Sequence, residues 1–331
     1  MFFYKKIWLI LLLLLILPAS SHAQKKQSLW VKADSLLAYI FRAKGDTNYV
    51  TRPDKRLTLR LLNNVSGTNF IARENSKEIV GSVFFKDPLR YTITLSANYR
   101  GLAASLAFNP SNIFGKHSST EFNINSYSNK YGFDILFENN GQYSATAKVN
   151  GQYFDVGEVD VKEKSLTING YYAFNGDRFS YPAAFSQSFI QKRSVGSLMA
   201  GISYHRSTLR MDHYEDVEYD DIRKIKTSYA GLGIGYGYNF VPSRKWLIHI
   251  SALPTLVLWN ESKVVYAGYV KDFDRMFPEY SIVGRFAIIH YYKSFFTGAT
   301  LVLNFTTVGD IEALRLTHNK WRSRFIIGMR F

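Results

Sequence analysis

The sequence predicts an all-β fold, a transmembrane antiparallel β-barrel of about twelve strands that follows a cleaved signal peptide. Three observations predict it. The carboxy-terminal strand alternates between apolar and charged residues, eleven similar segments precede it with alternately long and short connections, and the amino terminus has the layout of an export signal.

The last eleven residues, 321–331, have one apolar and one polar face. Side chains of a strand alternate with period two. One face therefore carries Phe325, Ile327, Met329 and Phe331, and the other carries Arg322, Arg324, Gly328 and Arg330. A strand that closes a barrel in a membrane needs this pattern, with hydrocarbon outside and a polar lumen inside.

The amino terminus is typical of a signal peptide over residues 1–23. Lys5 and Lys6 precede an unbroken apolar run over 7–17, and Ser21-His22-Ala23 leaves small residues at the two positions that a signal peptidase reads, before the predicted cleavage between Ala23 and Gln24. An uncleaved anchor is the alternative, but the run has only about half of the roughly 20 residues that a spanning helix needs. No cysteine follows it that could carry a lipid.

Composition separates the remaining classes of protein. The chain holds 23 Tyr, 25 Phe and no Cys, and its formal net charge is +15. It is too polar for membrane helices, but it suits strands that place every second residue in lipid. Without Cys there are no disulfides, thiolate metal sites or Cys nucleophiles. Because the chain is exported, we expect its positive charge to meet outer-membrane lipid and lipopolysaccharide, not nucleic acid.

The mature chain divides into two predicted parts. Residues 24–55 form a periplasmic segment in which 28–44 has the spacing of a short helix. This helix either rests on the barrel mouth or plugs the lumen. Residues 56–331 form the barrel, with alternating segments at 56–61, 89–98, 101–108, 119–127, 131–138, 164–175, 194–206, 228–240, 245–258, 281–292, 295–306 and 321–331.

The connections between these segments alternate in length. Outer-membrane barrels have long outer loops and short periplasmic turns. The odd-numbered connections here are long, and every even-numbered one is short except 176–193. We expect 176–193 to fold as a periplasmic helix or hairpin, or else to enter the pore from below.

Several short motifs resemble one family. They are Asp46-Thr47-Asn48-Tyr49, Asn98-Tyr99-Arg100-Gly101-Leu102, Phe108-Asn109-Pro110, Tyr131-Gly132-Phe133-Asp134, Gln191-Lys192-Arg193-Ser194 with Gly196-Ser197, and Phe296-Thr297-Gly298. In these motifs the mature chain resembles the family called domain of unknown function 4421, uncharacterised outer-membrane barrel proteins of Bacteroidetes-type bacteria. The resemblance implies an outer-membrane-type protein and supplies no catalytic residues.

Two patterns superficially suggest ligand sites. Glycines at 231, 233, 235 and 237 look like a nucleotide loop, but they lie in mid-strand, where we expect them to line the inner wall beside a plug or a facing side chain. Six carboxylates lie between Asp212 and Asp221. This loop either holds Ca²⁺, bridges lipopolysaccharide through divalent ions, or is simply solvated.

The sequence predicts no cofactor, no metal site and no enzyme. There is no H-E-x-x-H metal motif and no G-x-S-x-G serine motif. His205, His249 and His290 lie on predicted strands, and Ser251 shares a face with His249. We interpret the strand histidines as lumen or interface residues and keep an outer-membrane lipid hydrolase as the least favoured alternative.

Strand parity directs a set of charged side chains into the lumen. Unpaired charges out of water cost several kcal/mol, so they must pair or stay hydrated. Either they form a salt-bridged, plugged interior, or the arginines form a track for anions. The set is Arg56, Arg60, Glu121, Asp134, Glu138, Arg322, Arg324 and Arg330.

The sequence thus favours an integral outer-membrane protein of a Gram-negative cell, a non-enzymatic structural or surface-binding barrel. The alternative is a small selective pore for anions or acidic solutes. Expected partners are outer-membrane lipid, lipopolysaccharide and the outer-membrane assembly machinery. A small-molecule ligand, the state of the lumen and the number of subunits do not follow from the sequence.

Overall fold

The computed structural model describes residues 45–331 except 76–79, 100–101, 109, 111–119, 142, 160, 212–221, 273–277 and 310–313. The predicted signal peptide with its Ala23–Gln24 cleavage, the helix at 28–44 and the acidic run from Asp212 to Asp221 lie outside the described residues. Among those described, no helix has the length and apolar character needed to cross a bilayer.

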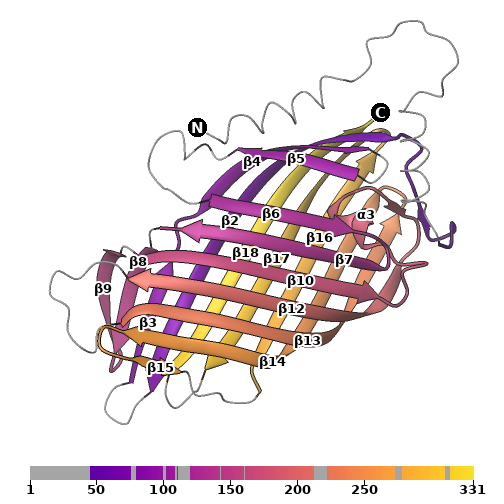
Figure 1. Ribbon diagram of the computed structural model, residues 1–331. Coiled ribbons are helices and arrows are strands. Elements are labelled where there is room, and N and C mark those ends of the chain that lie inside the picture. The colour runs from indigo at the N-terminus through magenta and orange to yellow at the C-terminus, as the bar shows by residue number, and fades with distance from the viewer. Residues whose placement is uncertain are drawn as a thin grey trace, which may run out of the picture. The chain divides into compact units, whose positions relative to one another are not determined.

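The fold is a curled antiparallel sheet, as predicted (Figure 1). Twelve strands follow one another along its main path, and each overlaps one predicted segment. In spatial order they are β5 (Leu102–Phe108), β4 (Arg90–Tyr99), β2 (Leu57–Asn75), β18 (Leu314–Arg330), β17 (Phe295–Gly309), β16 (Tyr280–Tyr292), β14 (Trp246–Tyr266), β13 (Ile222–Ser243), β12 (Val195–Met211), β10 (Val161–Ala173), β7 (Tyr131–Asn140) and β6 (Thr120–Tyr127).

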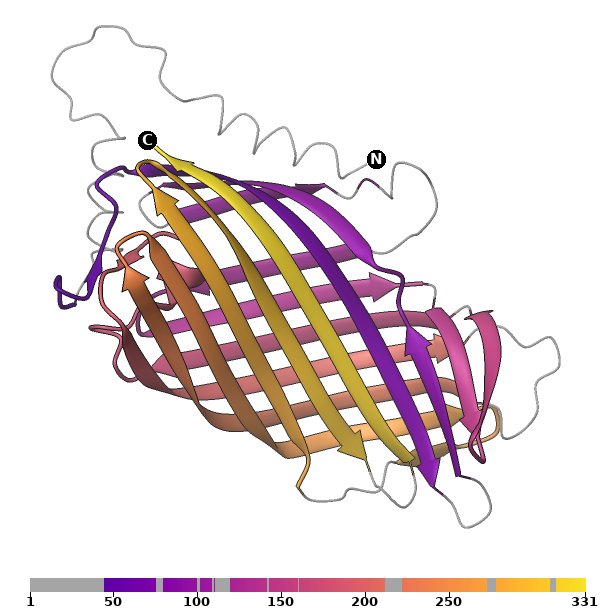
Figure 2. The same ribbon diagram turned by 180° about the vertical axis from the view of Figure 1, so that it is seen from behind.

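The first and last long strands pair with each other. β2 and β18 run side by side from Leu314 opposite Glu74 to Arg330 opposite Thr58 (Figure 2). Beyond this pair, the backbone N–H of Phe331 donates to the carbonyl of Leu57. The alternating carboxy-terminal segment therefore joins the two ends of the chain within one sheet.

The connections predicted as loops contain additional strands. The far half of β2 pairs with β3 (Val80–Lys86), β3 with β8 (Tyr143–Val149), and β8 with β9 (Gln152–Val159). β15 (Val270–Asp272) pairs with β14. Asn150 and Gly151 join β8 to β9 with positive φ at both residues, the geometry that the asparagine–glycine pair favours in hairpins.

Side-chain burial alternates along the strands. The exposed side chains are mostly apolar and the buried ones mostly polar, the reverse of the arrangement in a soluble protein. On β12 the apolar Ile202 is 57% exposed on the outside, whereas the neighbouring Ser203 is 5% exposed and faces inward. The same holds around the sheet, where outward positions are apolar and exposed, among them Leu198, Leu232, Ile234, Ile250, Leu256, Phe286, Phe325 and Ile327. Many of the polar strand side chains are buried inside, although exposed charged residues such as Lys164 and Arg206 also occur.

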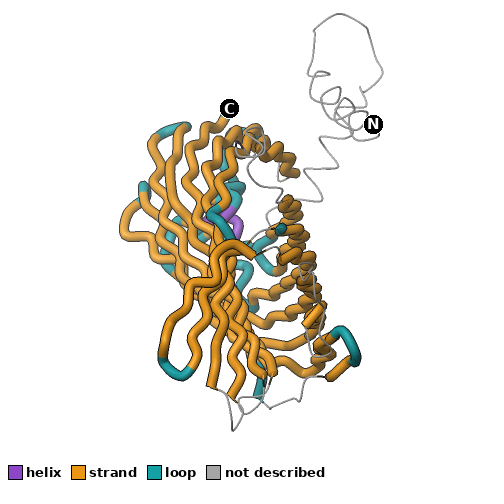
Figure 3. Tube along the Cα trace, turned by 90° about the vertical axis from the view of Figure 1, so that its left-hand side faces the viewer, coloured by secondary structure: helices purple, strands orange, loops and turns teal. Residues whose placement is uncertain are grey.

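A short internal segment lies between the walls of the sheet. It contains α3 (Tyr181–Phe185), which Figure 3 shows between two layers of strands. The hydroxyl of Ser180 caps the helix by accepting from the backbone N–H of Ala183, and Pro182 lies in its first turn. Further along, β11 (Ile190–Gln191) pairs with β1 (Val50–Thr51).

The glycines of β13 lie on the inner wall, as expected, but they mostly approach backbone. A Cβ added at Gly231, Gly233 or Gly235 would lie 2.1–2.4 Å from a carbonyl oxygen of β14. Only at Gly237 would it meet the internal segment, 3.1 Å from Phe179. Glycine here lets two strands approach at a sharply curved part of the wall.

Candidate functional site

The middle of the connection 176–193 lies inside the barrel, in agreement with the second of the two predicted alternatives, whereas Asp177, Arg178, Lys192 and Arg193 near its ends are exposed. The side chains of Phe179, Tyr181 and Phe185 are buried there. They join Met199 and Ile289 of the wall in one apolar cluster. We call residues 176–193 the plug.

Two of the arginines predicted to line the lumen bind the plug backbone. Arg60 donates to the carbonyl of Ser186 at 2.9 Å and to Gln187 Oε1 at 3.3 Å. Arg330 donates to the carbonyl of Gln187 at 3.1 Å. Gln187 itself is fully buried with a left-handed φ of 53°. The two guanidinium groups thus hold an irregular stretch of backbone whose carbonyls have no helical partners.

A third buried arginine, Arg285, lies beside α3. It was not among the lumen residues predicted from the sequence. Arg285 pairs with Asp134 and donates to the hydroxyl of Tyr127 at 3.3 Å. Its guanidinium lies 5.6 Å from the ring centre of Tyr181, within cation–π range. Arg285 follows strand parity like the other inward residues, so its position could have been predicted.

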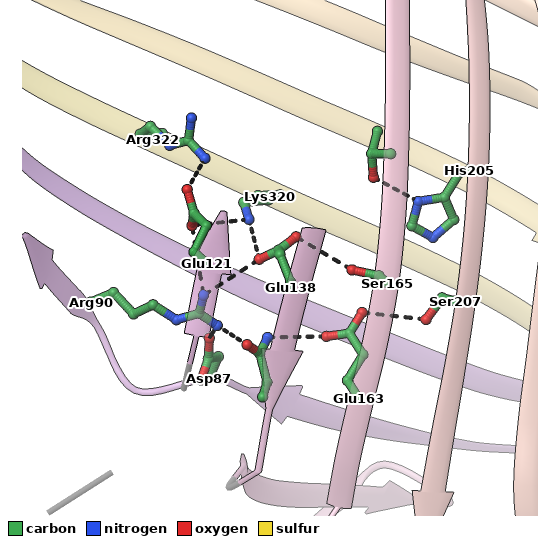
Figure 4. Close-up of polar contacts among 12 residues, drawn as sticks. Asp87, Arg90, Glu121, Glu138, Glu163, Ser165, His205, Ser207, Lys320 and Arg322 are labelled. Atoms are coloured by element: carbon green, nitrogen blue, oxygen red, sulfur yellow. Dashed lines mark hydrogen bonds and ion pairs between the residues drawn. The ribbon is translucent and has the colours of Figure 1, made fainter. Parts of the chain in front are cut away.

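The largest charged group is a cluster of six side chains that we call the seam cluster: Asp87, Arg90, Glu121, Glu138, Lys320 and Arg322 (Figure 4). Arg322 pairs with Glu121, and Lys320 pairs with both Glu121, at 3.5 Å, and Glu138. Arg90 completes it, 2.8 Å from Asp87 and 3.6 Å from both glutamates.

The seam cluster is neutral by formal charge, since three carboxylates face three cations. A polar chain continues from it, because Asn140 donates to Glu163 at 3.1 Å, and Tyr143 donates to the same carboxylate at 2.5 Å (Figure 4 shows Glu163 beside the cluster). Asp87, Arg90, Glu163 and Lys320 were not singled out by sequence analysis. Asp87 precedes β4, in a segment predicted as loop.

The remaining predicted residues are placed as follows. Arg324 donates to Asn64 at 2.7 Å inside the barrel. Arg56 was predicted to line the lumen, but it is exposed and precedes β2, so it does not face the interior. The strand begins one residue later than the apolar alternation indicated. Met329 is half-buried, while Phe325, Ile327 and Phe331 are exposed on the outer face.

A cavity of about 70 Å³ lies among the lumen charges and is bordered by Asp134, His205, Arg285, Arg322 and Arg324 among others. A cavity of this size and polarity can hold water molecules. Among the described residues, no group of three or more carboxylate or histidine side chains is arranged to hold a metal ion.

Fold and site together define a class of protein, an all-β curled sheet with an apolar outer face, whose polar interior is filled by its own chain and by paired charges. The chain belongs to the family described as Domain of unknown function (DUF4421), whose model matches residues 44–331. No curated protein matches it.

Solved structures with a similar course of the chain are outer-membrane proteins. The outer membrane protease OmpT from Escherichia coli is 10% identical with a TM-score of 0.43, covering 85% of this chain and 98% of its own. The translocator domain of the autotransporter NalP from Neisseria meningitidis is 9% identical with a TM-score of 0.32, covering 91% and 94%. The P. putida toluene transporter TodX is 9% identical with a TM-score of 0.30, covering 84% and 91%.

Proposed function

We propose that this protein is an integral outer-membrane β-barrel with a sealed lumen, which in this sealed state acts without catalysis as a structural or surface-binding barrel. Its outer face supports a membrane location, because contiguous apolar side chains of this extent are not left in water. Exposed aromatic residues lie toward both strand ends, as at membrane interfaces. They include Tyr236, Tyr238, Phe240, Trp246, Tyr292 and Phe295 toward the end that carries the carboxy terminus, and Trp259 and Tyr280 toward the other.

The single observation that carries the sealed state is the plug. It is buried against both walls, and Arg60 and Arg330 bind its backbone. The arginines that a selective pore would offer to anions are therefore engaged with the protein itself. A cavity of about 70 Å³ lies between the lumen charges, and we expect the plug to leave no path for a solute through it.

The proposed surface contacts are with lipopolysaccharide and outer-membrane lipid, and insertion depends on the outer-membrane assembly machinery. The end opposite the carboxy terminus extends into the β8–β9 hairpin, whose Tyr153, Phe154 and Val156 are exposed. In the proposed orientation this hairpin stands above the outer leaflet. It offers an edge strand and an aromatic surface for binding.

Planar-bilayer conductance tests the sealed lumen. We expect the purified, refolded protein to insert without opening ion channels. The double variant Arg60→Ala, Arg330→Ala loses two hydrogen bonds to the plug backbone and one to Gln187 Oε1, and we expect it to show intermittent channels. An exposed double variant, Lys164→Ala with Arg206→Ala, serves as the matched control and should remain silent. Steady, anion-selective channels from the unmodified protein would establish the pore instead.

A further inference from the structure

Three polar side chains form a hydrogen-bonded chain on the inner wall beneath the plug. His249 Nδ1 lies 2.7 Å from Asn239 Oδ1, and His249 Nε2 lies 2.9 Å from Ser251 Oγ. Asn239 belongs to β13, and the other two belong to β14. His249 is 0% exposed and Ser251 is 6% exposed, so the chain is closed to solvent.

The neighbouring hydrogen bonds fix the histidine tautomer. The amide nitrogen of Gln191 faces three backbone carbonyls, so its oxygen must face Asn239. Asn239 then donates through Nδ2 to that oxygen and to the carbonyl of Ser180, which leaves Oδ1 for His249. Nδ1 therefore carries the proton, and Nε2 accepts from the hydroxyl of Ser251.

A nucleophile, a base within hydrogen-bond reach and a group that orients the base are the recurring parts of serine acyl-transfer sites. We propose that Ser251 is a latent nucleophile, with His249 as its base and Asn239 as the residue that positions the base. The substrate class is a carboxylic ester with an apolar acyl group. This goes beyond the sealed barrel proposed above, because it concerns what the protein does once the plug is displaced.

The surroundings fit an acyl ester. Arg285 is the direct cross-strand partner of Ser251, and its guanidinium, paired with Asp134, also lies 5.6 Å from the ring of Tyr181, which contacts Ser251. A cation near the serine would favour the negative charge that develops during acyl transfer. The space beside His249 is filled by the plug, with the ring of Phe185 5.1 Å and the ring of Tyr181 5.0 Å from that of His249. We expect an apolar acyl group to occupy the place of these rings once they withdraw.

The reaction balances with water as the second substrate. Ser251 Oγ bonds to the ester carbonyl carbon as its proton passes to His249 Nε2. The carbon–oxygen bond to the alcohol then breaks, and the alcohol leaves with that proton. A water repeats the sequence on the acyl-serine, releasing the carboxylic acid and restoring the hydroxyl.

The plug keeps the site inactive at rest. The hydroxyl of Tyr181 lies 3.3 Å from Ser251 Oγ, on the side from which an ester would approach. Asn239 also holds the plug through Ser180 and Gln191. The same residue thus orients the histidine and binds the segment that covers it.

A dialkyl fluorophosphate tests the proposal, because it bonds covalently to activated serines. We expect the full chain to react slowly at Ser251, and the double variant Tyr181→Ala, Phe185→Ala to react about 100-fold faster, as mass spectrometry of the peptide would show. Adding His249→Ala to the double variant should abolish the gain, since a general base contributes about 10²–10⁴-fold. Ser203, an inward serine of β12, is the control and should remain unlabelled.

An independent readout shows whether the plug has opened. The chain has no Cys, so Ser251→Cys in the double-variant background gives a single thiol, whose reaction with a maleimide reports access. If the thiol reacts but Ser251 of the double variant does not take up the fluorophosphate, the proposal is overturned. Labelling that is unchanged by His249→Ala would overturn it as well. Bilayer conductance tests the sealed lumen separately from both results.

Discussion

At the residue scale, Gly235 shows how little space some positions allow. An added Cβ there would lie 2.1 Å from the carbonyl oxygen of Ala252, which belongs to the backbone of β14 and cannot rotate away. Gly284 on β16 is different, because its Cβ would meet nothing nearer than the Leu303 side chain at 3.7 Å. Two glycines of one wall, on strands that flank β14 on either side, therefore have opposite tolerance.

We predict that Gly235→Ala destabilises the barrel, whereas Gly284→Ala is close to neutral. Forcing a methyl group into a packed site typically costs about 1–3 kcal/mol. The measurement is the urea midpoint of unfolding in detergent micelles, which should fall for the first variant only. Equal midpoints for both variants would show that the wall at β13 is not as tight as described.

The sequence predicted which face of the sheet a side chain occupies better than it predicted the residue with which that side chain forms an ion pair. Period-two parity correctly placed Arg60, Glu121 and Glu138 inside, because parity follows from strand geometry alone. It could not identify Lys320 as the partner of Glu138, since that pair joins strands that are far apart in the chain. Arg56 was misplaced because a strand end depends on backbone hydrogen bonds that side-chain pattern does not reveal.

At the scale of elements, the seam cluster connects parts of the sheet that are not neighbours along it. Glu121 of β6 and Glu138 of β7 bind Lys320 of β18 and Arg90 of β4. β6 and β7 lie at one end of the sheet path, and β4 and β18 lie toward the other. These ion pairs therefore hold the two ends of the path together across the interior.

We predict that Lys320→Met destabilises the barrel by about 3–5 kcal/mol, because removing one partner leaves Glu138 buried without its closest cation. The double variant Lys320→Met, Glu138→Gln should regain part of the loss. Lys164→Met, at an exposed position of β10, is the matched control and should change little. Resistance of the folded form to heat in detergent, followed by gel mobility, measures all three. A Lys320→Met variant as stable as the control would mean that the cluster does not join the walls.

The elements of the main sheet could be predicted, and the internal ones only in part. All twelve of these strands are seven or more residues long and overlap a predicted segment of period-two alternation, which is a strong signal. The plug was noticed in the sequence because its connection is longer than the other even-numbered connections. Its entry into the lumen depends on contacts with Arg60 and Arg330, two residues that lie far from it in the sequence. The β8–β9 hairpin was missed, although Asn150-Gly151 marks its turn.

At the scale of the whole molecule, the main feature is the reversed polarity of the sheet, because the proposed membrane location follows from it. Apolar side chains face outward around the sheet, and many of its inner charges are in ion pairs. This polarity was predictable, because a strand with one charged and one apolar face has two consistent placements, and the predicted export signal with the Cys-free, aromatic-rich composition favours the membrane one. The proposed membrane location rests on this polarity.

Spin-label accessibility at two adjacent positions of β12 tests whether hydrocarbon covers the outer face of the sheet. Because the chain has no Cys, Ile202→Cys and Ser203→Cys each give a single attachment site. In lipid vesicles, we predict that the label at 202 meets dissolved oxygen readily and a water-soluble nickel complex hardly at all, while the label at 203 is shielded from both. A label at 202 that meets the nickel complex as freely as an exposed loop residue would show that water, not hydrocarbon, covers the outer face, and would contradict the account.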